Sequence, residues 1–178
     1  VEVFGGANRR SLVTGPLGDP VEASWRLARR TAVIESAEAC GLTLAGGPEE
    51  NDPVSASTSG VGELIAIAVE SGATRVLIGV GGSATTDGGL GALRALYPTQ
   101  RLKGVEIVVA CDVATRFVDA AEVFAPQKGA TPSQVKLLHN RLVRLEQVYA
   151  DEYGIDLSGL DRGGAAGGPA GALAAIGA

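Results

Sequence analysis

Two short apolar runs on either side of a glycine-rich stretch constrain the fold of this chain most strongly. Residues 75–80 (RVLIGV) and 105–110 (VEIVVA) are rich in β-branched side chains and almost continuously apolar, as buried parallel strands are. Between them lie the glycine-rich residues 81–89 and a helix-like segment that must end by Pro98. This order predicts an α/β fold, as a three-layer α/β/α arrangement with a mainly parallel or mixed sheet.

Helical patterns stand on both sides of this unit. Apolar residues in the segment 61–68 recur at positions i, i+3, i+4 and i+7, which predicts a helix that ends near Gly72. Further on, Thr131 and Gln134 have the spacing of a capping box, in which each side chain binds a backbone N–H at the helix start. We therefore expect a second, longer helix that ends at Gly154.

The N-terminal part of the sequence has shorter patterns. Residues 1–4 and 11–14 flank a turn-like stretch and are predicted to be short strands, in the manner of a hairpin. We interpret residues 21–30 as a short helix. The β-branched run 31–35 is followed by the helix-like residues 36–40, with Gly41 as a stop.

Length and composition indicate one globular domain and exclude several classes of protein. The 178 residues, 46% of them hydrophobic and 20% charged, fit a single α/β domain over residues 1–178. A net charge of −5 argues against a nucleic-acid partner, and no apolar run approaches the roughly 20 residues that span a bilayer. The two cysteines, Cys40 and Cys111, are expected to be buried thiols in a reducing cytoplasm. The sequence contains no Met at all, which predicts a processed or incomplete chain.

The first stretch that could bind a ligand or take part in catalysis is residues 78–89, IGVGGSATTDGG. It follows a predicted strand and precedes a predicted helix, and ligands of open α/β sheets bind where strands end. Gly81 and Gly82 would let a ligand approach the backbone, and Ser83 and Thr85 offer hydroxyl groups. The stretch is a candidate cradle for a phosphate or a carboxylate. A tight turn capped by a hydroxyl residue or by Asp87 explains the same residues at least as well.

Two aspartates follow the two predicted strands. If the strands are near neighbours, Asp87 and Asp112 overhang the same edge of the sheet. Paired carboxylates there could hold Mg²⁺, or one of them could act as a general base. We favour two unrelated loop aspartates over a metal site. Asp87 is kept as a candidate general base.

Lys128 is a third candidate, in the stretch PQKGATP at residues 126–132. It stands just before a predicted helix N-terminus, where a cation is unfavourable unless an anion is nearby. This favours anion binding slightly, although a solvated lysine is the ordinary case. His139, the single histidine, lies off the apolar stripe of its predicted helix and is expected to be exposed.

These motifs, in their order along the chain, resemble those of the type I bacterial glycerate kinases. The segments concerned are VTGPLGDPVEASW, TAVIESAEACGL, ELIAIAVESGATRVLIGVGGSATTDGGLGALRAL, ACDV, VFAPQKGATP and GGAAGGPAGAL. The resemblance runs over nearly the whole chain. It implies a cytoplasmic kinase that uses ATP and Mg²⁺ to phosphorylate D-glycerate to phosphoglycerate.

With that resemblance, the candidate residues take specific roles. Gly81, Gly82, Ser83 and Thr85 become the anion cradle, and Lys128 a contact to phosphate or to the substrate carboxylate. Asp87 becomes the candidate base for the glycerate hydroxyl or a Mg²⁺ ligand, with Asp112 as a further metal ligand.

The sequence also departs from the family. Relatives are considerably longer, and segments like DSFKGSLSA, ADGGEGT and TGEGRLDAQT have no counterpart here. In the family those segments build a Rossmann-like domain, so this chain is expected to be the second α/β domain of a longer two-domain kinase. Internal shortening relative to the family is expected near residues 29–31, 97–104 and 110–129. The rival interpretation is a non-catalytic domain that binds or senses a small molecule such as glycerate.

Overall fold

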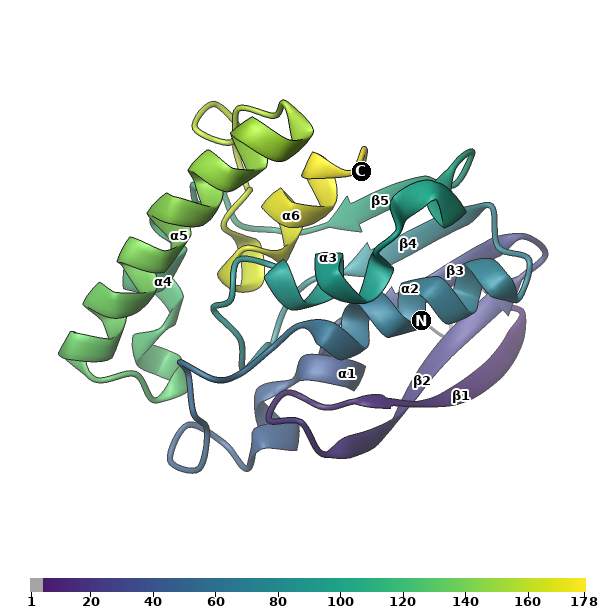
Figure 1. The fold of residues 1–178 in the computed structure, drawn as a ribbon. Coiled ribbons are helices and arrows are strands. Elements are labelled where there is room, and N and C mark those ends of the chain that lie inside the picture. Colours follow the sequence, from purple (N-terminus) through teal and green to yellow (C-terminus); the bar gives the residue numbers. More distant parts are fainter. Residues whose placement is uncertain (1–4) are drawn as a thin grey trace.

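A mixed five-stranded sheet forms the centre of the molecule, and the computed structural model describes residues 5–178 (Figure 1). The strands stand in the sheet in their order along the chain. Strands β1 to β3 are antiparallel neighbours, whereas β3, β4 and β5 run parallel. Their bounds are β1 Ala7–Thr14, β2 Pro20–Ala28, β3 Thr31–Glu35, β4 Arg75–Gly79 and β5 Glu106–Ala110.

Helices connect the parallel strands and continue beyond them. The α-helices are α1 Ala37–Cys40, α2 Ser59–Glu70, α3 Leu90–Leu96, α4 Ala120–Phe124, α5 Pro132–Tyr153 and α6 Pro169–Ala175. Short 3-10 helices cover η2 Leu42–Ala45, η3 Thr99–Leu102, η4 Pro126–Lys128 and η5 Ala165–Gly167. The predicted capping box is confirmed, because the Gln134 amide donates to Thr131 Oγ1 and the Thr131 amide donates to Gln134 Oε1. No helix within residues 5–178 combines the length and apolar character needed to cross a membrane.

The N-terminal expectations are corrected in part. Residues 21–30 are not a helix, because β2 pairs with β1 along its length and with β3 at its end. Ala23 and Trp25 are buried two residues apart, which is the period of a strand. The hairpin is thus formed by β1 and β2, and the strand predicted at residues 1–4 lies outside the described residues.

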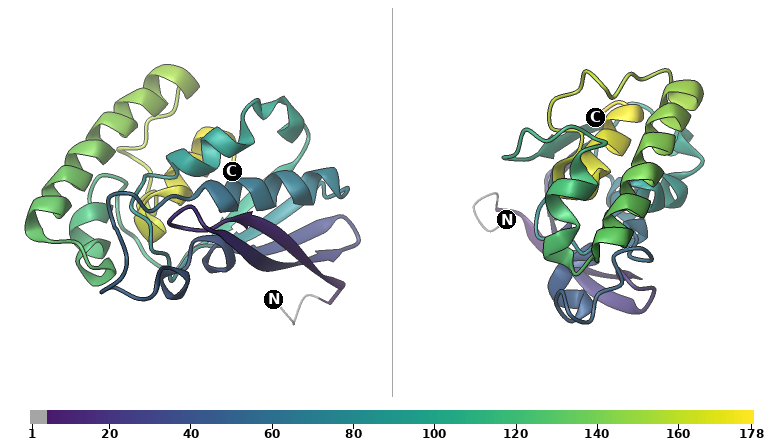
Figure 2. Two further views of the ribbon diagram at one scale, coloured as in Figure 1. Left: turned by 60° about the horizontal axis from the view of Figure 1, so that its bottom comes forward. Right: turned by 90° about the vertical axis from the view of Figure 1, so that its left-hand side faces the viewer.

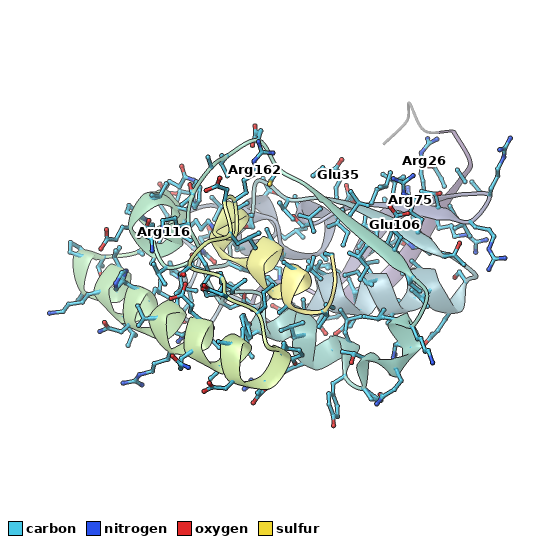
Figure 3. The ribbon with its side chains drawn as sticks, turned by 90° about the horizontal axis from the view of Figure 1, so that it is seen from above. Arg26, Glu35, Arg75, Glu106, Arg116 and Arg162 are labelled. Carbon is cyan, nitrogen blue, oxygen red and sulfur yellow. The ribbon has the colours of Figure 1, made fainter. Side chains whose placement is uncertain are left out.

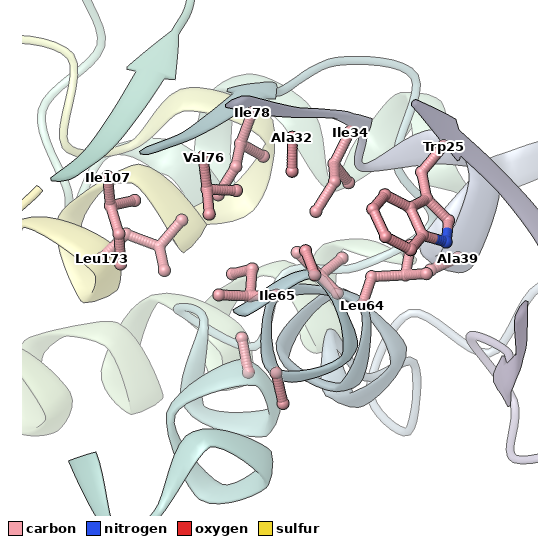
Figure 4. Close-up of a cluster of buried hydrophobic side chains, with 14 of the residues drawn as sticks. Trp25, Ala32, Ile34, Ala39, Leu64, Ile65, Val76, Ile78, Ile107 and Leu173 are labelled. Carbon is pink, nitrogen blue, oxygen red and sulfur yellow. The ribbon is translucent and has the colours of Figure 1, made fainter. Parts of the chain in front are cut away.

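One face of the sheet carries the main hydrophobic core (Figure 4). Ile34, Ile78 and Ile107, from three parallel strands, point from the sheet toward the helices. Leu64 and Ile65 of α2 pack against them, and both are fully buried. Helix α3 packs on α2 from the outer side. The periodicity predicted for residues 61–68 therefore marks the face of α2 that meets the sheet.

The opposite face of the sheet has no helix over it in residues 5–178 (Figure 3). Its side chains mix charged and apolar types, and Arg75 of β4 forms an exposed ion pair with Glu106 of β5 at 3.1 Å. Leu77 and Val108 lie beside each other two positions further along the same strands. The predicted α/β class and mixed sheet are confirmed, but the expected third layer is not seen within the described residues.

Helix α5 lies beyond the carboxyl ends of β4 and β5 (Figures 1 and 2), and a second hydrophobic cluster forms where it packs. The cluster joins α5 to the loops that leave those strands, with Phe117, Leu142 and Tyr149 buried at its centre. Tyr149 Oη donates a hydrogen bond of 3.0 Å to the carbonyl of Gly88. The long helix therefore supports the glycine-rich stretch that follows β4.

Candidate functional site

A cavity of about 460 Å³ opens where β4 ends and brings together distant parts of the sequence. Five of its lining residues are candidates predicted from the sequence: Gly81, Gly82, Ser83, Asp112 and Lys128. Leu42, Val80, Val113, Phe124, Gln127 and Ala166 complete the lining. Parallel strands place their following loops at one edge of the sheet, which explains why these loops meet.

Three consecutive residues that line this cavity, Gly81, Gly82 and Ser83, have backbone amides without a hydrogen-bond acceptor among residues 5–178. The Val80 amide donates to the carbonyl of Ala110, and the Ala84 amide donates to the carbonyl of Cys40. Between them, the amides of residues 81–83 donate to no other residue between 5 and 178. A Cβ added at Gly81 would meet nothing within 4 Å, and Gly82 has a φ of +59°. A row of free amides beside open space is suited to bind an anion.

Lys128 lines the cavity and is only 3% exposed. Its Nζ donates to Ser83 Oγ at 3.0 Å, to the carbonyl of Thr85 at 2.5 Å and to the carbonyl of Ala166 at 3.0 Å. Burial lowers the pKa of Lys128 to about 8, against the opposing effects of Cys40 and Asp87. The solvated lysine considered for this position is therefore excluded, and all three ammonium hydrogens have acceptors inside the protein.

Asp87 does not line the cavity, and its carboxylate is occupied by the fold. Its Oδ2 accepts hydrogen bonds from the Thr58 amide, the Thr58 hydroxyl and the Gly91 amide, at 2.8–3.1 Å. Its Oδ1 accepts from the Gly89 amide at 3.0 Å. The residue is 8% exposed and ties the start of α2 to the start of α3. This geometry favours a structural anchor, while the base role stays a prediction.

The two aspartates are not brought together at the cavity. Asp112 is exposed and lines both this cavity and a shallower neighbouring hollow of about 630 Å³, neither of which includes Asp87. Residues 5–178 contain no group of three or more His, Cys, Asp and Glu side chains placed to hold a metal. The two hollows share Val80, Gly81 and Gly82, and Glu35 lines the second one. Asp112 is thus the one predicted metal ligand that faces the open site.

The remaining predicted side chains lie under or away from the cavity. Thr85 is fully buried, so its hydroxyl does not face a ligand in this structure, and only its carbonyl reaches Lys128. Cys40 is buried as expected, and burial followed by the charge of Asp87 raises the pKa of its thiol to about 12. Cys111 is also expected to be buried, but it is partly exposed. His139 is expected to be exposed, but it is partly buried, with Nδ1 3.7 Å from Glu122 Oε1.

Ala166 is a site residue that the sequence analysis did not single out. Its carbonyl accepts from both Ser83 Oγ and Lys128 Nζ. It has a φ of +58°, a left-handed conformation that is uncommon for a residue with a Cβ. The available signal was the glycine cluster at residues 162–171, which marks a tight turn without showing what the turn approaches.

The chain has relatives of known family in both sequence and structure. The sequence model of the glycerate kinase family matches residues 1–98 and 97–178. Glycerate 2-kinase of Escherichia coli (strain K12) is 39% identical over 204 residues, and glycerate kinase of Bacillus subtilis (strain 168) is 35% identical over 201 residues. These alignments cover 96% and 94% of this chain, and 53% and 52% of the two relatives.

A solved structure gives the same result. A crystallised Salmonella typhimurium LT2 protein, assigned as glycerate kinase 2, superposes with a TM-score of 0.93 and 36% sequence identity. The match covers 99% of this chain and 56% of that protein. The chain therefore spans about half the length of the relatives it matches. Because the family model covers it from end to end, the chain belongs to the glycerate kinase family.

Proposed function

We propose that this chain is the second α/β domain of a two-domain glycerate kinase and contributes the anion-binding part of its active site. The reaction is the ATP-dependent phosphorylation of D-glycerate to phosphoglycerate, carried out in the cytoplasm. A Rossmann-like domain of the same polypeptide completes the enzyme. Three facts support this proposal: the family of the chain, its coverage of about half of each relative, and the cavity at the end of β4.

The observation that carries the proposal is the row of free amides from Gly81 to Ser83 at the mouth of the cavity. Both substrates of a glycerate kinase are anions, a carboxylate and a polyphosphate. Backbone amides bind such groups without bringing in a charge that must itself be neutralised. Phosphoryl transfer depends mainly on positioning and charge neutralisation, which is the task that these amides can perform.

The residues present fit part of a Mg²⁺ site. Protein-bound Mg²⁺ takes one or two carboxylates together with substrate phosphates and water. Asp112 is exposed at the cavity and can supply one carboxylate, whereas both oxygens of Asp87 already accept hydrogen bonds. When bound, Mg²⁺ neutralises charge on the transferred phosphoryl group. We assign the metal contact to Asp112, and ATP to the site completed by the other domain.

The second candidate is a binding domain without catalysis. It rests on the same cavity at the end of β4, which could hold a small anion whether or not the protein catalyses a reaction. Such a domain would keep the glycerate pocket and have no ATP turnover.

One experiment separates the two candidates. Calorimetry of this chain with D-glycerate measures binding, and ADP release with D-glycerate and MgATP measures turnover. We expect binding without turnover by this chain alone and turnover by the complete reading frame. Absence of turnover in the complete frame would favour the binding domain. Absence of D-glycerate binding in both proteins would contradict the proposed substrate.

A further inference from the structure

Lys128 connects three segments that approach the cavity from different parts of the chain. It closes η4, and its ammonium reaches Ser83 and Thr85 after β4 and Ala166 in η5. Ser83 Oγ itself donates to the carbonyl of Ala166, so the lysine, the serine and the alanine carbonyl form a closed triangle. We call these three residues the clamp.

The clamp stands directly beside the free amides. Ser83 is both a member of the clamp and the last residue of the amide row. Two backbone hydrogen bonds hold the same segment to the chain around α1. The Ala84 amide donates to the carbonyl of Cys40, and the Leu42 amide donates to the carbonyl of Gly82. The row is therefore held at its end, while Gly81 and Gly82 remain exposed.

We propose that Lys128 is a positioning residue, which acts through Ser83 and Ala166 to hold the amides of residues 81–83 open toward the cavity. For the identity of the anion, this inference rests on the proposed function. A direct ligand contact would require a free ammonium hydrogen, and Lys128 has none in this structure because three acceptors surround it. The lysine therefore shapes the site through its contacts with Ser83 and Ala166.

The charged state of Lys128 matters for this role. Only the ammonium form has hydrogens for all three acceptors. The titratable groups that influence it are Cys40, at the end of α1, and Asp87, before α3. The ring of Phe124 in α4 lies 5.9 Å from Nζ and favours the cation further. Above the pKa of about 8 the neutral amine has two hydrogens for three acceptors, so one contact of the ammonium should be lost locally, although the folded chain as a whole gains stability.

The test compares Lys128→Met, which removes every donor, with Lys128→Arg, which keeps the charge through alkaline pH. Lys103→Met is the matched control, because Lys103 is exposed. The first measurement is amide hydrogen exchange without ligand. We expect Lys128→Met to speed exchange by at least about tenfold at Ala84 and Gly88, whose amides bond to the carbonyls of Cys40 and Gly167. Unchanged exchange at these amides would overturn the clamp.

The second measurement is the affinity for D-glycerate and for sulfate, neither of which titrates between pH 7 and 9. The wild-type chain should lose affinity as pH rises through about 8, whereas Lys128→Arg should show a flat profile. If Lys128 only stabilised the fold, its substitution would shift the melting temperature, and the affinity would not depend on pH in either protein. A flat affinity profile in both proteins would therefore also overturn the inference. If the wild-type chain binds neither anion, the proposed function fails, and ligand-free exchange still decides whether the clamp exists.

Discussion

The glycine-rich stretch after β4 consists of two halves with opposite properties. The open half, residues 81–83, exposes its glycines and leaves its amides free beside a cavity. The anchored half, residues 85–89, is entirely buried and holds the carboxylate that joins α2 to α3. Neighbouring residues of one motif therefore serve different purposes, with binding in the first half and support in the second.

This contrast explains why the motif is rich in glycine at both ends. At Gly81, a Cβ would meet nothing within 4 Å, so the absent side chain leaves room beside the cavity. At Gly89, a Cβ would overlap that of Ala172 and lie 2.9 Å from Pro169 Cα, so the absent side chain allows α6 to pack closely. The same residue type provides ligand access in one half and close packing in the other.

The largest effect should come from Asp87→Ala in the anchored half. The change leaves the amides of Thr58, Gly89 and Gly91 without an acceptor in a buried region. Each buried unsatisfied group costs about 1–3 kcal/mol, so we expect the free energy of unfolding to fall by about 4 kcal/mol in denaturant titrations. Asp87→Asn should be intermediate, because its NH₂ group would face a backbone donor.

Asp161→Ala is the matched control, since Asp161 is exposed, and it should change stability by less than about 0.5 kcal/mol. If Asp87→Asn kept wild-type stability in the complete enzyme and lost about 10²-fold or more in kcat, Asp87 would be the base and the proposed division of the loop would be wrong.

The pH dependence of stability should reveal the buried charge that links the two halves. The pKa of Lys128 falls from 10.5 in the unfolded chain to about 8 in the folded chain. Between these values the unfolded state binds more protons, so this residue makes stability rise with pH, by about 3 kcal/mol in total. The raised pKa of Cys40 acts in the opposite direction above pH 9. Below pH 9 the Cys40 thiol keeps its proton in both states, so the difference between wild type and Lys128→Met in urea titrations reports Lys128 there. A flat difference between pH 7 and 9 would contradict the assignment.

Substitutions at Gly89 and Gly81 should have smaller effects on stability, and they compare the two halves directly. Gly89→Ala should destabilise by about 2 kcal/mol, because the backbone has a φ of +75° and the methyl meets α6. Gly81→Ala should leave the thermal melting temperature nearly unchanged and weaken D-glycerate binding measured by calorimetry, because the methyl occupies the open space. The opposite pattern, a stable Gly89→Ala and an unstable Gly81→Ala, would reverse the roles of the two halves.

The smallest effect is expected for Thr86→Val. The Thr86 hydroxyl is buried and has no hydrogen-bond partner among the described residues. Replacing it by a methyl group removes an unsatisfied polar atom at nearly constant volume, so stability should stay equal or rise by up to about 1 kcal/mol. A clear loss of stability in thermal melts would show that this hydroxyl has a partner.

Local patterns in the sequence predicted most of the sheet but only part of the site. The parallel strands β4 and β5 and the capping box at Thr131 depend on neighbouring residues, so they could be identified directly. Strand β2 could not be identified in this way, because its short alternation of apolar residues leads into a segment that also suits a helix. Pairing with β1, which no local pattern contains, makes this segment a strand.

The roles of Asp87 and Lys128 depend on contacts that no local pattern contains. Asp87 binds Thr58, 29 positions earlier, and Lys128 binds Ser83, 45 positions earlier. The sequence identified both as charged residues near glycine-rich turns, where either a ligand or the fold could use the charge. Only the packing of the loops shows that both charges are satisfied inside the protein.

The most direct test of the two halves is an NMR titration of ¹⁵N-labelled chain with D-glycerate. We predict saturable shifts concentrated at the amides of Gly81, Gly82 and Ser83, which are free to donate hydrogen bonds to the anion. The amides of Gly89 and Gly91, which donate to Asp87, should stay unchanged. Shifts centred on Gly89 and Gly91, with none at the open half, would contradict the account.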